Sequence, residues 1–218
     1  MKTNKIFFIG MNRTGTYSYY HFLIHNNIKS IHQKKDKNNK KDYGYWYENS
    51  LDYFKHHQAF VTSFEHYYDN EIYLDFNFLN INFPNSKFIL NTRNLDDWLL
   101  SRLNHNKPSY YKSEKKYLDE TDLLRWCKYR NNHYKKIYDY FKNKELLILN
   151  ITDINKTKKL KDFLNIKSDI TIDHYHDTSK IKNFQVINQK NKIIVDNFLK
   201  KYIIEEDWKS DGIIRFKI

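Results

Sequence analysis

Cysteine, proline, glycine and alanine are all scarce in this chain of 218 residues. It has one cysteine, two prolines and four glycines, and Ala59 is its only alanine. Because Cys127 is alone, no intrachain disulfide can form, which excludes a secreted fold built on disulfides. Its neighbours Leu124 and Trp126 predict a buried structural thiol and not a nucleophile. Where glycine is so rare, each remaining glycine suggests a backbone requirement, because glycine alone visits positive φ freely.

Long hydrophobic runs are also missing. No window approaches the roughly 20 apolar residues of a membrane span, and the apolar run of residues 5–9 is too short for a signal peptide. We therefore expect a soluble, cytoplasmic protein. Apolar residues make up 40% of the chain and aromatic residues 17%, which argues against a disordered chain. The length suits a single domain over residues 1–218.

A formal net charge of +12 predicts an anionic ligand or partner. The charge alone leaves the anion open: nucleic acid, an acidic glycan, a nucleotide cofactor and an anionic membrane surface all fit. Part of it also has an ordinary explanation, since lysine keeps proteins soluble.

Apolar runs and helical periodicity alternate along the chain. The pattern predicts buried strands at residues 5–9, 59–63, 87–91 and 146–151, and helices at residues 16–26, 95–105, 122–141, 158–164 and 191–202. Asn94 is expected to cap the second of these helices and Thr121 the third. This order predicts an α/β fold, a doubly wound and mainly parallel sheet with helices on both faces.

The segment of residues 10–18 (GMNRTGTYS) follows the first predicted strand and precedes a helix. Gly10 and Gly15 stand where a phosphate-binding loop needs glycine. Such a loop turns backbone N–H groups toward an oxyanion, and the helix that follows adds its positive end. A nucleoside-triphosphatase loop would continue with Lys and then Ser or Thr, whereas this chain has Thr16 and Tyr17. The cation is instead Arg13, so the loop suits an anion but not Mg²⁺-ATP chemistry.

A second candidate anion site follows the strand at residues 87–91. Arg93 ends the strand, and Ser101 lies eight residues later on the next helix. One guanidinium and one hydroxyl at a helix start are suited to a phosphate group. Taken singly, Arg93 is also compatible with an ion pair to Asp96, and Ser101 with an ordinary helix position.

The two motifs together resemble the P-loop sulfotransferases. KIFFIGMNRTGT (residues 5–16) looks like the family's 5′-phosphosulfate loop, and KFILNTRNLDDWLLS (residues 87–101) looks like its 3′-phosphate element. The similarity extends over residues 4–165. It implies a P-loop-type α/β sheet and an enzyme that transfers a sulfuryl group from 3′-phosphoadenosine 5′-phosphosulfate (PAPS) to an acceptor hydroxyl, leaving 3′-phosphoadenosine 5′-phosphate (PAP).

The resemblance also implies site residues. Arg13 would contact the transferring sulfuryl group where the family often has lysine, and Arg93 and Ser101 would bind the 3′-phosphate. The remaining cofactor contacts would come from the loop and the first helical turn: Asn12, Thr14, Gly15, Thr16, Tyr17 and Ser18. Tyr17 and Ser18 depart from the residues that many relatives carry.

The reaction needs a general base to take the acceptor's proton. The family usually places it after the second core strand, and here that window holds Glu65, His66 and Asp69. Asp69 falls nearest the position of an aspartate in related small sulfotransferases. The scheme needs no metal, and the pair His174 and His176 has no convincing partner ligands.

Two other functions remain open from the sequence. A protein that keeps the nucleotide site but has lost turnover would be a binding module, as the departures at Arg13 and Tyr17 allow. Basic residues interleaved with tyrosine and phenylalanine also fit a nucleic-acid-binding protein, although these aromatics fall largely at core spacing. The acceptor, a sugar, a phenol, another small molecule or a glycan, is not readable from the sequence.

Overall fold

The computed structural model describes residues 4–32, 58–61, 76–105, 119–173, 184–206 and 213–217. The chain divides into two compact units, each built from two stretches of sequence: residues 1–92 with 143–176, and residues 93–142 with 177–218. The expectation of a single domain stays a prediction. Within the described residues, no helix is both long and apolar enough to cross a membrane.

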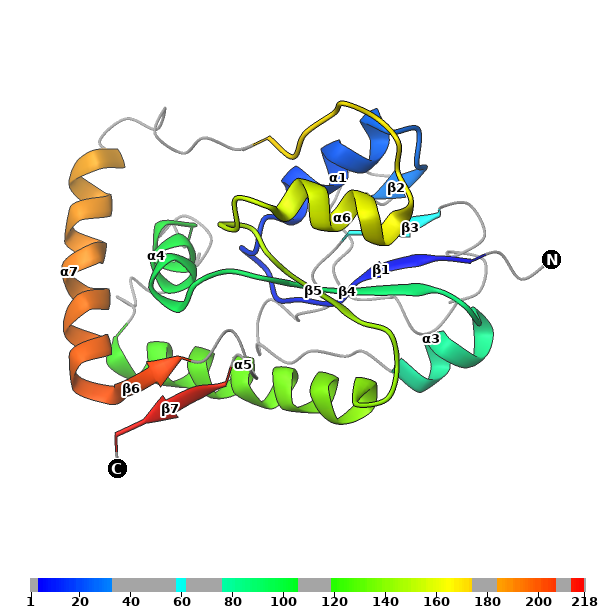
Figure 1. Ribbon diagram of the computed structural model, residues 1–218. Helices are drawn as coiled ribbons and strands as arrows, with labels where there is room; N and C mark the ends of the chain where they lie inside the picture. Colours follow the sequence, from blue (N-terminus) through cyan, green and yellow to red (C-terminus); the bar gives the residue numbers. More distant parts are fainter. Residues whose placement is uncertain are drawn as a thin grey trace, which may run out of the picture. The chain divides into compact units, whose positions relative to one another are not determined.

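The first unit is built on a five-stranded sheet in the order β2-β3-β1-β4-β5, and all of its strand pairs are parallel (Figure 1). The strands are β1 (Ile6–Phe8), β2 (Ser30–Ile31), β3 (Ala59–Phe60), β4 (Lys87–Thr92) and β5 (Leu147–Asn150). The predicted mainly parallel α/β sheet is therefore confirmed. The two-residue strand β2 was not expected, because so short a run has no readable period.

Both faces of this sheet are apolar. On one face, α1 (Thr16–His25) and α6 (Lys156–Leu164) pack against the strands (Figure 1) and share a core of aliphatic and aromatic side chains: Phe8, Tyr19, Phe22, Leu23, Ile89, Leu149 and Leu160. The other face carries Phe7, whose ring stacks on Phe60 at 5.4 Å and on Phe88 at 5.3 Å between centroids. Phe83, just after α3 (Phe76–Asn82), packs against Phe7. Burial on both faces explains why β1 and β4 read as continuous apolar runs.

The strand order reverses between β1 and β4. After β1 the chain passes through α1 to β2 on one side of the sheet, and after β4 it returns to β5 on the other side. Open parallel sheets bind their ligands at such a reversal, beyond the carboxyl ends of the strands. The carboxyl ends of β1 and β4, which lead into Gly10 and Arg93, are therefore the expected place for a ligand.

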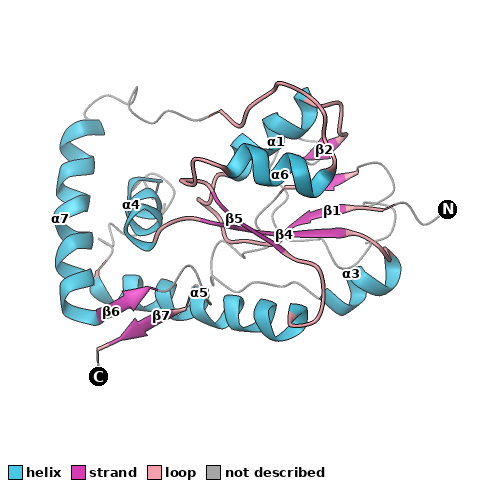
Figure 2. Cartoon of the chain, viewed as in Figure 1, coloured by secondary structure: helices cyan, strands magenta, loops and turns pink. Residues whose placement is uncertain are grey.

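The second unit contains α4 (Leu95–His105), α5 (Glu120–Phe141), α7 (Phe184–Tyr202) and a hairpin of the antiparallel strands β6 (Ile203–Glu206) and β7 (Ile214–Phe216) (Figure 2). The prediction for α4 is confirmed, with Asp96 and Asp97 in its first turn. The hairpin was not predicted, and α7 begins seven residues before the expected residue 191.

The start of α5 differs from the prediction. Asp119, and not Thr121, is the N-cap, and its carboxylate accepts hydrogen bonds from the N–H groups of Thr121 at 2.9 Å and Asp122 at 3.1 Å. The Asp122 carboxylate in turn accepts from the Asp119 N–H. In this reciprocal capping box, two carboxylates accept from three backbone N–H groups at the start of α5.

A buried ion pair joins several elements of the second unit. The side chain of Arg130 is 1% exposed, lies over the rings of Trp98 and Tyr134, and pairs with Glu206 from β6. The other carboxylate oxygen of Glu206 accepts from the N–H of Leu95 at 2.8 Å, the first residue of α4. One carboxylate thus links α4, α5 and the hairpin, and removal of either charge would leave the other buried without this partner.

The structure confirms that Cys127 is buried, as its apolar neighbours predicted. Burial raises the pKa of this thiol to about 12, and the nearby Glu206 carboxylate acts in the same direction against Arg130 and Arg102. Because the thiolate is the nucleophile, we expect a thiol reagent to label the native protein about 100-fold more slowly than the denatured chain, since only opened molecules react. Labelling kinetics across a denaturant series measure this. Rapid, complete labelling without denaturant would contradict the packing of α5.

Candidate functional site

A loop of residues 10–15, the oxyanion loop, connects β1 to α1 at the reversal of strand order. Its first residue lies against β4. The Gly10 N–H donates a 2.9 Å hydrogen bond to Oδ1 of Asn91, and a Cβ at Gly10 would overlap the Asn91 carbonyl oxygen and lie 2.8 Å from its Cγ. Gly10 is therefore needed for the close approach of two backbones.

The loop backbone alternates in handedness. Arg13 has φ 63° and Gly15 has φ 85°, while Thr14 between them is not in the positive-φ region. Such alternation turns successive N–H groups toward one side and forms an anion-binding concavity. A non-glycine residue in this region costs roughly 1–2 kcal/mol, so the surroundings must hold Arg13 there. Strain of this kind is characteristic of functional loops.

The helix after the loop adds to the same potential. Gly15 is the N-cap of α1 and has no side chain that could cap this end. The first N–H groups of α1 and its positive dipole end therefore face the loop, an arrangement that favours an oxyanion. Asn12 and Arg13, both half-buried, carry the side chains nearest to the middle of the turn.

Thr14 supports the loop from inside. Its side chain is 1% exposed in the structure, and the hydroxyl donates to the carbonyl of Met11 at 2.6 Å. The same hydroxyl accepts from Nδ2 of Asn91 at 2.5 Å. The hydroxyl is thereby used within the loop, so any contact from Thr14 to a ligand comes from its backbone N–H. Asn91 was not predicted as a site residue, although a single side-chain amide in a largely apolar strand could have indicated it.

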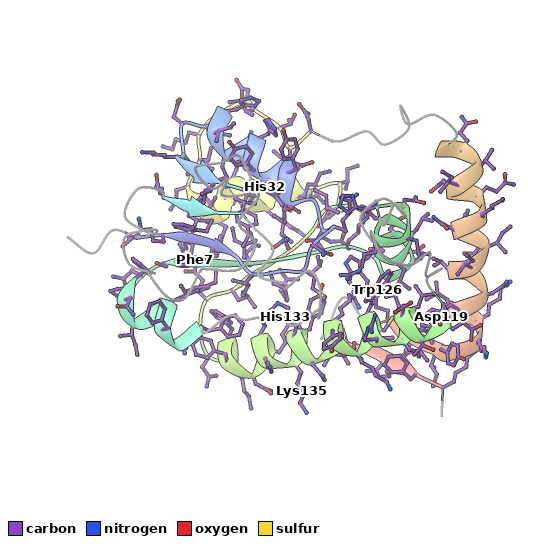
Figure 3. All side chains as sticks on the ribbon, turned by 180° about the vertical axis from the view of Figure 1, so that it is seen from behind. Phe7, His32, Asp119, Trp126, His133 and Lys135 are labelled. Atoms are coloured by element: carbon purple, nitrogen blue, oxygen red, sulfur yellow. The ribbon has the colours of Figure 1, made fainter. Side chains whose placement is uncertain are left out.

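The next residues form the first turn of α1. The hydroxyl of Thr16 lies 3.0 Å from Nε2 of His32, which follows β2 (Figure 3). The ring of Tyr17 packs edge-on against His21 at 4.3 Å and His32 at 5.3 Å between centroids, while Ser18 is buried. Nothing in the sequence pointed to His32, because only the parallel pairing of β2 with β3 brings it to the start of α1.

Gly15 meets the end of the neighbouring strand β5. A Cβ at Gly15 would lie 2.5 Å from Cγ1 and 2.6 Å from Cδ1 of Ile151. Ile151 is itself fixed, because its N–H donates to the carbonyl of Thr92 at 3.0 Å. Gly15 is thus required twice, by its backbone conformation and by the side chain beneath it.

Arg93 and Ser101 belong to the second unit. Arg93 lies two residues before Leu95, the first residue of α4, and Ser101 lies half-buried in the middle of that helix. Burial lowers the pKa of Arg93, and the carboxylates of Asp97 and Asp96 oppose this effect. Arginine keeps its charge in proteins, so the partly desolvated guanidinium gains from an anionic partner.

The candidate bases Glu65, His66 and Asp69 lie outside the described residues, as do His174 and His176. The described part of the predicted site therefore consists of the oxyanion loop with the first turn of α1 in one unit, and Arg93 with Ser101 in the other. The loop can hold an oxyanion through backbone N–H groups, a helix start and the charge of Arg13.

Gly10 and Gly15 should differ in how much stability the protein loses when each is replaced by alanine. Gly10→Ala places a methyl group on backbone atoms that cannot rotate away, so we expect a loss of at least about 3 kcal/mol in unfolding free energy, the upper part of the range for overpacking. Gly15→Ala costs roughly 1–2 kcal/mol from its backbone conformation plus the contact with Ile151. Thermal and urea unfolding of both variants measure this.

Ile151→Ala provides the control for Gly15. Since it removes the two nearest carbon atoms, Gly15→Ala should cost less in that background than in the wild type, and Gly10→Ala should cost the same in both. Equal costs for Gly15→Ala in the two backgrounds would show that Ile151 does not restrict this position.

Comparison with known proteins identifies the family of the chain. No curated protein matches the chain. A family model described as a sulfotransferase domain matches residues 5–148, which include the oxyanion loop, Arg93 and Ser101. The match covers about two thirds of the 218 residues. The chain belongs to the sulfotransferase domain family, whose members transfer sulfuryl groups.

Proposed function

We propose that this protein is a PAPS-dependent sulfotransferase that transfers the sulfuryl group to an acceptor hydroxyl by in-line displacement. The observation that carries the proposal is the oxyanion loop: alternating backbone handedness at Arg13 and Gly15, an α1 start without a side-chain cap, and a place at the strand reversal. The family match supports sulfuryl transfer in general.

The oxyanion loop fits the phosphosulfate end of this donor. Gly15 holds the positive φ of the turn, and the cation is an arginine, which pairs with planar or tetrahedral oxyanions through several N–H groups. The donor supplies a sulfuryl group attached to a phosphate leaving group. Arg13 and the N–H groups of Thr14, Gly15 and Thr16 would hold that end and stabilise charge on the departing oxygen by fixed electrostatics.

Arg93 and Ser101 would hold the 3′-phosphate. A partly buried guanidinium just before a helix start pairs more strongly with a dianion than with a neutral hydroxyl, and this attraction must exceed the repulsion from the nearby carboxylates of Asp97 and Asp96. The 3′-phosphate distinguishes PAPS from ordinary adenylates. Selectivity for that phosphate is therefore the property through which Arg93 can be tested.

Asp69 would accept the proton of the acceptor hydroxyl as its oxygen attacks sulfur. The bond from sulfur to the acceptor oxygen forms while the bond to the phosphate oxygen breaks, and the proton passes to the carboxylate. Glu65 and His66 remain the alternatives, since both lie in the same window of the sequence.

Calorimetric titration with PAP, adenosine 5′-phosphate and ATP tests the donor. We expect the wild type to prefer PAP, and Arg93→Ala to lose roughly 10- to 100-fold in PAP affinity while its weak binding of adenosine 5′-phosphate changes little, because one charged hydrogen-bonding group is lost. Arg215→Ala is the matched control: that arginine is about half exposed and pairs with Glu205 across the hairpin. Indiscriminate nucleotide binding, or binding that falls steeply with salt and ignores the 3′-phosphate, would refute the proposal and favour a nucleic-acid ligand.

The general base is tested by turnover. Asp69→Asn should reduce kcat by about 100-fold or more with unchanged PAP affinity, as expected when a positioned base is lost. Glu65→Gln and His66→Gln are the comparison variants and should retain most of the activity. Full turnover by Asp69→Asn would assign the role elsewhere. PAP binding without turnover on any acceptor in the wild type would support a binding module instead.

A further inference from the structure

Asn91 connects the strand β4 to the oxyanion loop by both ends of its side-chain amide. Oδ1 accepts from the Gly10 N–H at 2.9 Å, and Nδ2 donates to the Thr14 hydroxyl at 2.5 Å. The residue is 0% exposed. A ligand cannot reach this side chain, so whatever Asn91 does for binding it does through the loop.

The chain of hydrogen bonds that starts at Asn91, the relay, continues beyond the Thr14 hydroxyl. Having accepted from Asn91, the Thr14 hydroxyl donates its own hydrogen to the carbonyl of Met11 at 2.6 Å. This last bond closes a ring of covalent and hydrogen bonds around Asn12 and Arg13, the two residues between. Arg13 is the residue whose backbone is held at φ 63°. The ring thus spans the strained position and restricts the turn to one conformation.

Only asparagine makes both contacts at this point. Aspartate at position 91 would keep the acceptor for Gly10 but lose the donor for Thr14, and leucine would fill a similar volume without either. Glutamine is one methylene longer in a site that has no space, because Gly10 already lies against the Asn91 backbone. The donor and acceptor of one amide therefore set the distance between β4 and both ends of the turn.

We infer that Asn91 is a positioning residue of the anion site: through Thr14 it holds Arg13 and the loop N–H groups in the conformation that binds the sulfuryl donor. The identity of the ligand in this inference rests on the proposed function, whereas the hydrogen bonds of Asn91 do not depend on it. Removing Asn91 should then resemble a partial loss of Arg13, although Asn91 touches no ligand. A merely structural residue would instead lower the folded fraction and leave the affinity of the folded molecules intact.

The experiment compares Asn91→Leu, Asn91→Asp, Thr14→Val and the pair Asn91→Leu with Thr14→Val. Thr92→Val is the matched control, since Thr92 is the next residue on β4 and its buried hydroxyl has no hydrogen-bond partner within the described residues. Three quantities are measured on each protein: the exchange rate of the Gly10 amide without ligand, the Kd for PAP, and the separate KM values for donor and acceptor.

We expect Asn91→Leu and Thr14→Val each to weaken PAP binding about tenfold or more, since each breaks the relay. The pair should lose less than the sum of the two, because both act on one network. Hydrogen exchange of the Gly10 amide should accelerate in Asn91→Leu. It should stay slow in Thr14→Val, because that variant keeps Asn91 and its Oδ1 acceptor. The donor KM should rise while the acceptor KM stays constant, Thr14→Ser should recover affinity relative to Thr14→Val, and Thr92→Val should match the wild type.

Wild-type PAP affinity in a folded Asn91→Leu protein, or additive losses in the pair, would overturn the inference. If Asn91→Leu does not fold, Asn91→Asp and Thr14→Val carry the same test. A wild type that ignores PAP would refute the proposed donor; inorganic sulfate, followed by the amide shifts of the loop, then serves as the probe. Sulfate shifts lost in Thr14→Val would still support the role of Asn91, and a wild-type loop that shows no sulfate shifts would overturn it.

Discussion

The close approach of β1 and β4 at their carboxyl ends is the constraint on which the proposed anion site depends. Gly10 permits the approach because it has no side chain, and the Asn91 amide holds it with one bond to the Gly10 N–H and one to the Thr14 hydroxyl. In the turn that follows, Gly15 adopts a positive φ without steric cost, and these bonds help to hold Arg13 at its positive φ. The site is therefore a property of two adjacent strands as much as of the loop itself.

The same principle, a polar side chain that joins separate elements, recurs in the second unit. Glu206 pairs with the buried Arg130 of α5 and accepts from the first N–H of α4. Asn131 of α5 donates to and accepts from the backbone of Ile214, at 2.9 Å in both directions, and so fixes β7. Each of these groups would cost free energy if left unpaired in a buried place. Their pairing makes the arrangement of α4, α5 and the hairpin specific within that unit.

Much of the fold was predictable because its signals are local. Continuous apolar runs at β1, β4 and β5 and helical periodicity in α1, α4 and α5 are consequences of burial on one or both faces. The errors also have local causes. Asp119 caps α5 in place of Thr121 because its carboxylate reaches two N–H groups at once. The strands β2, β6 and β7, of two, four and three residues, are too short to show a period.

The sequence by itself determined the fold class, and it predicted an anion site at the glycine loop after β1 with Arg13 as its cation, because glycine spacing and residue type can be read along the chain. Tertiary structure decided which side chains hold that loop. Asn91 lies 77 residues from Thr14 and His32 lies 16 from Thr16, and no local pattern joins such pairs. They meet because parallel strands place their carboxyl ends side by side at one edge of a sheet, and hydrogen bonds across that edge depend on register, which a single sequence does not display.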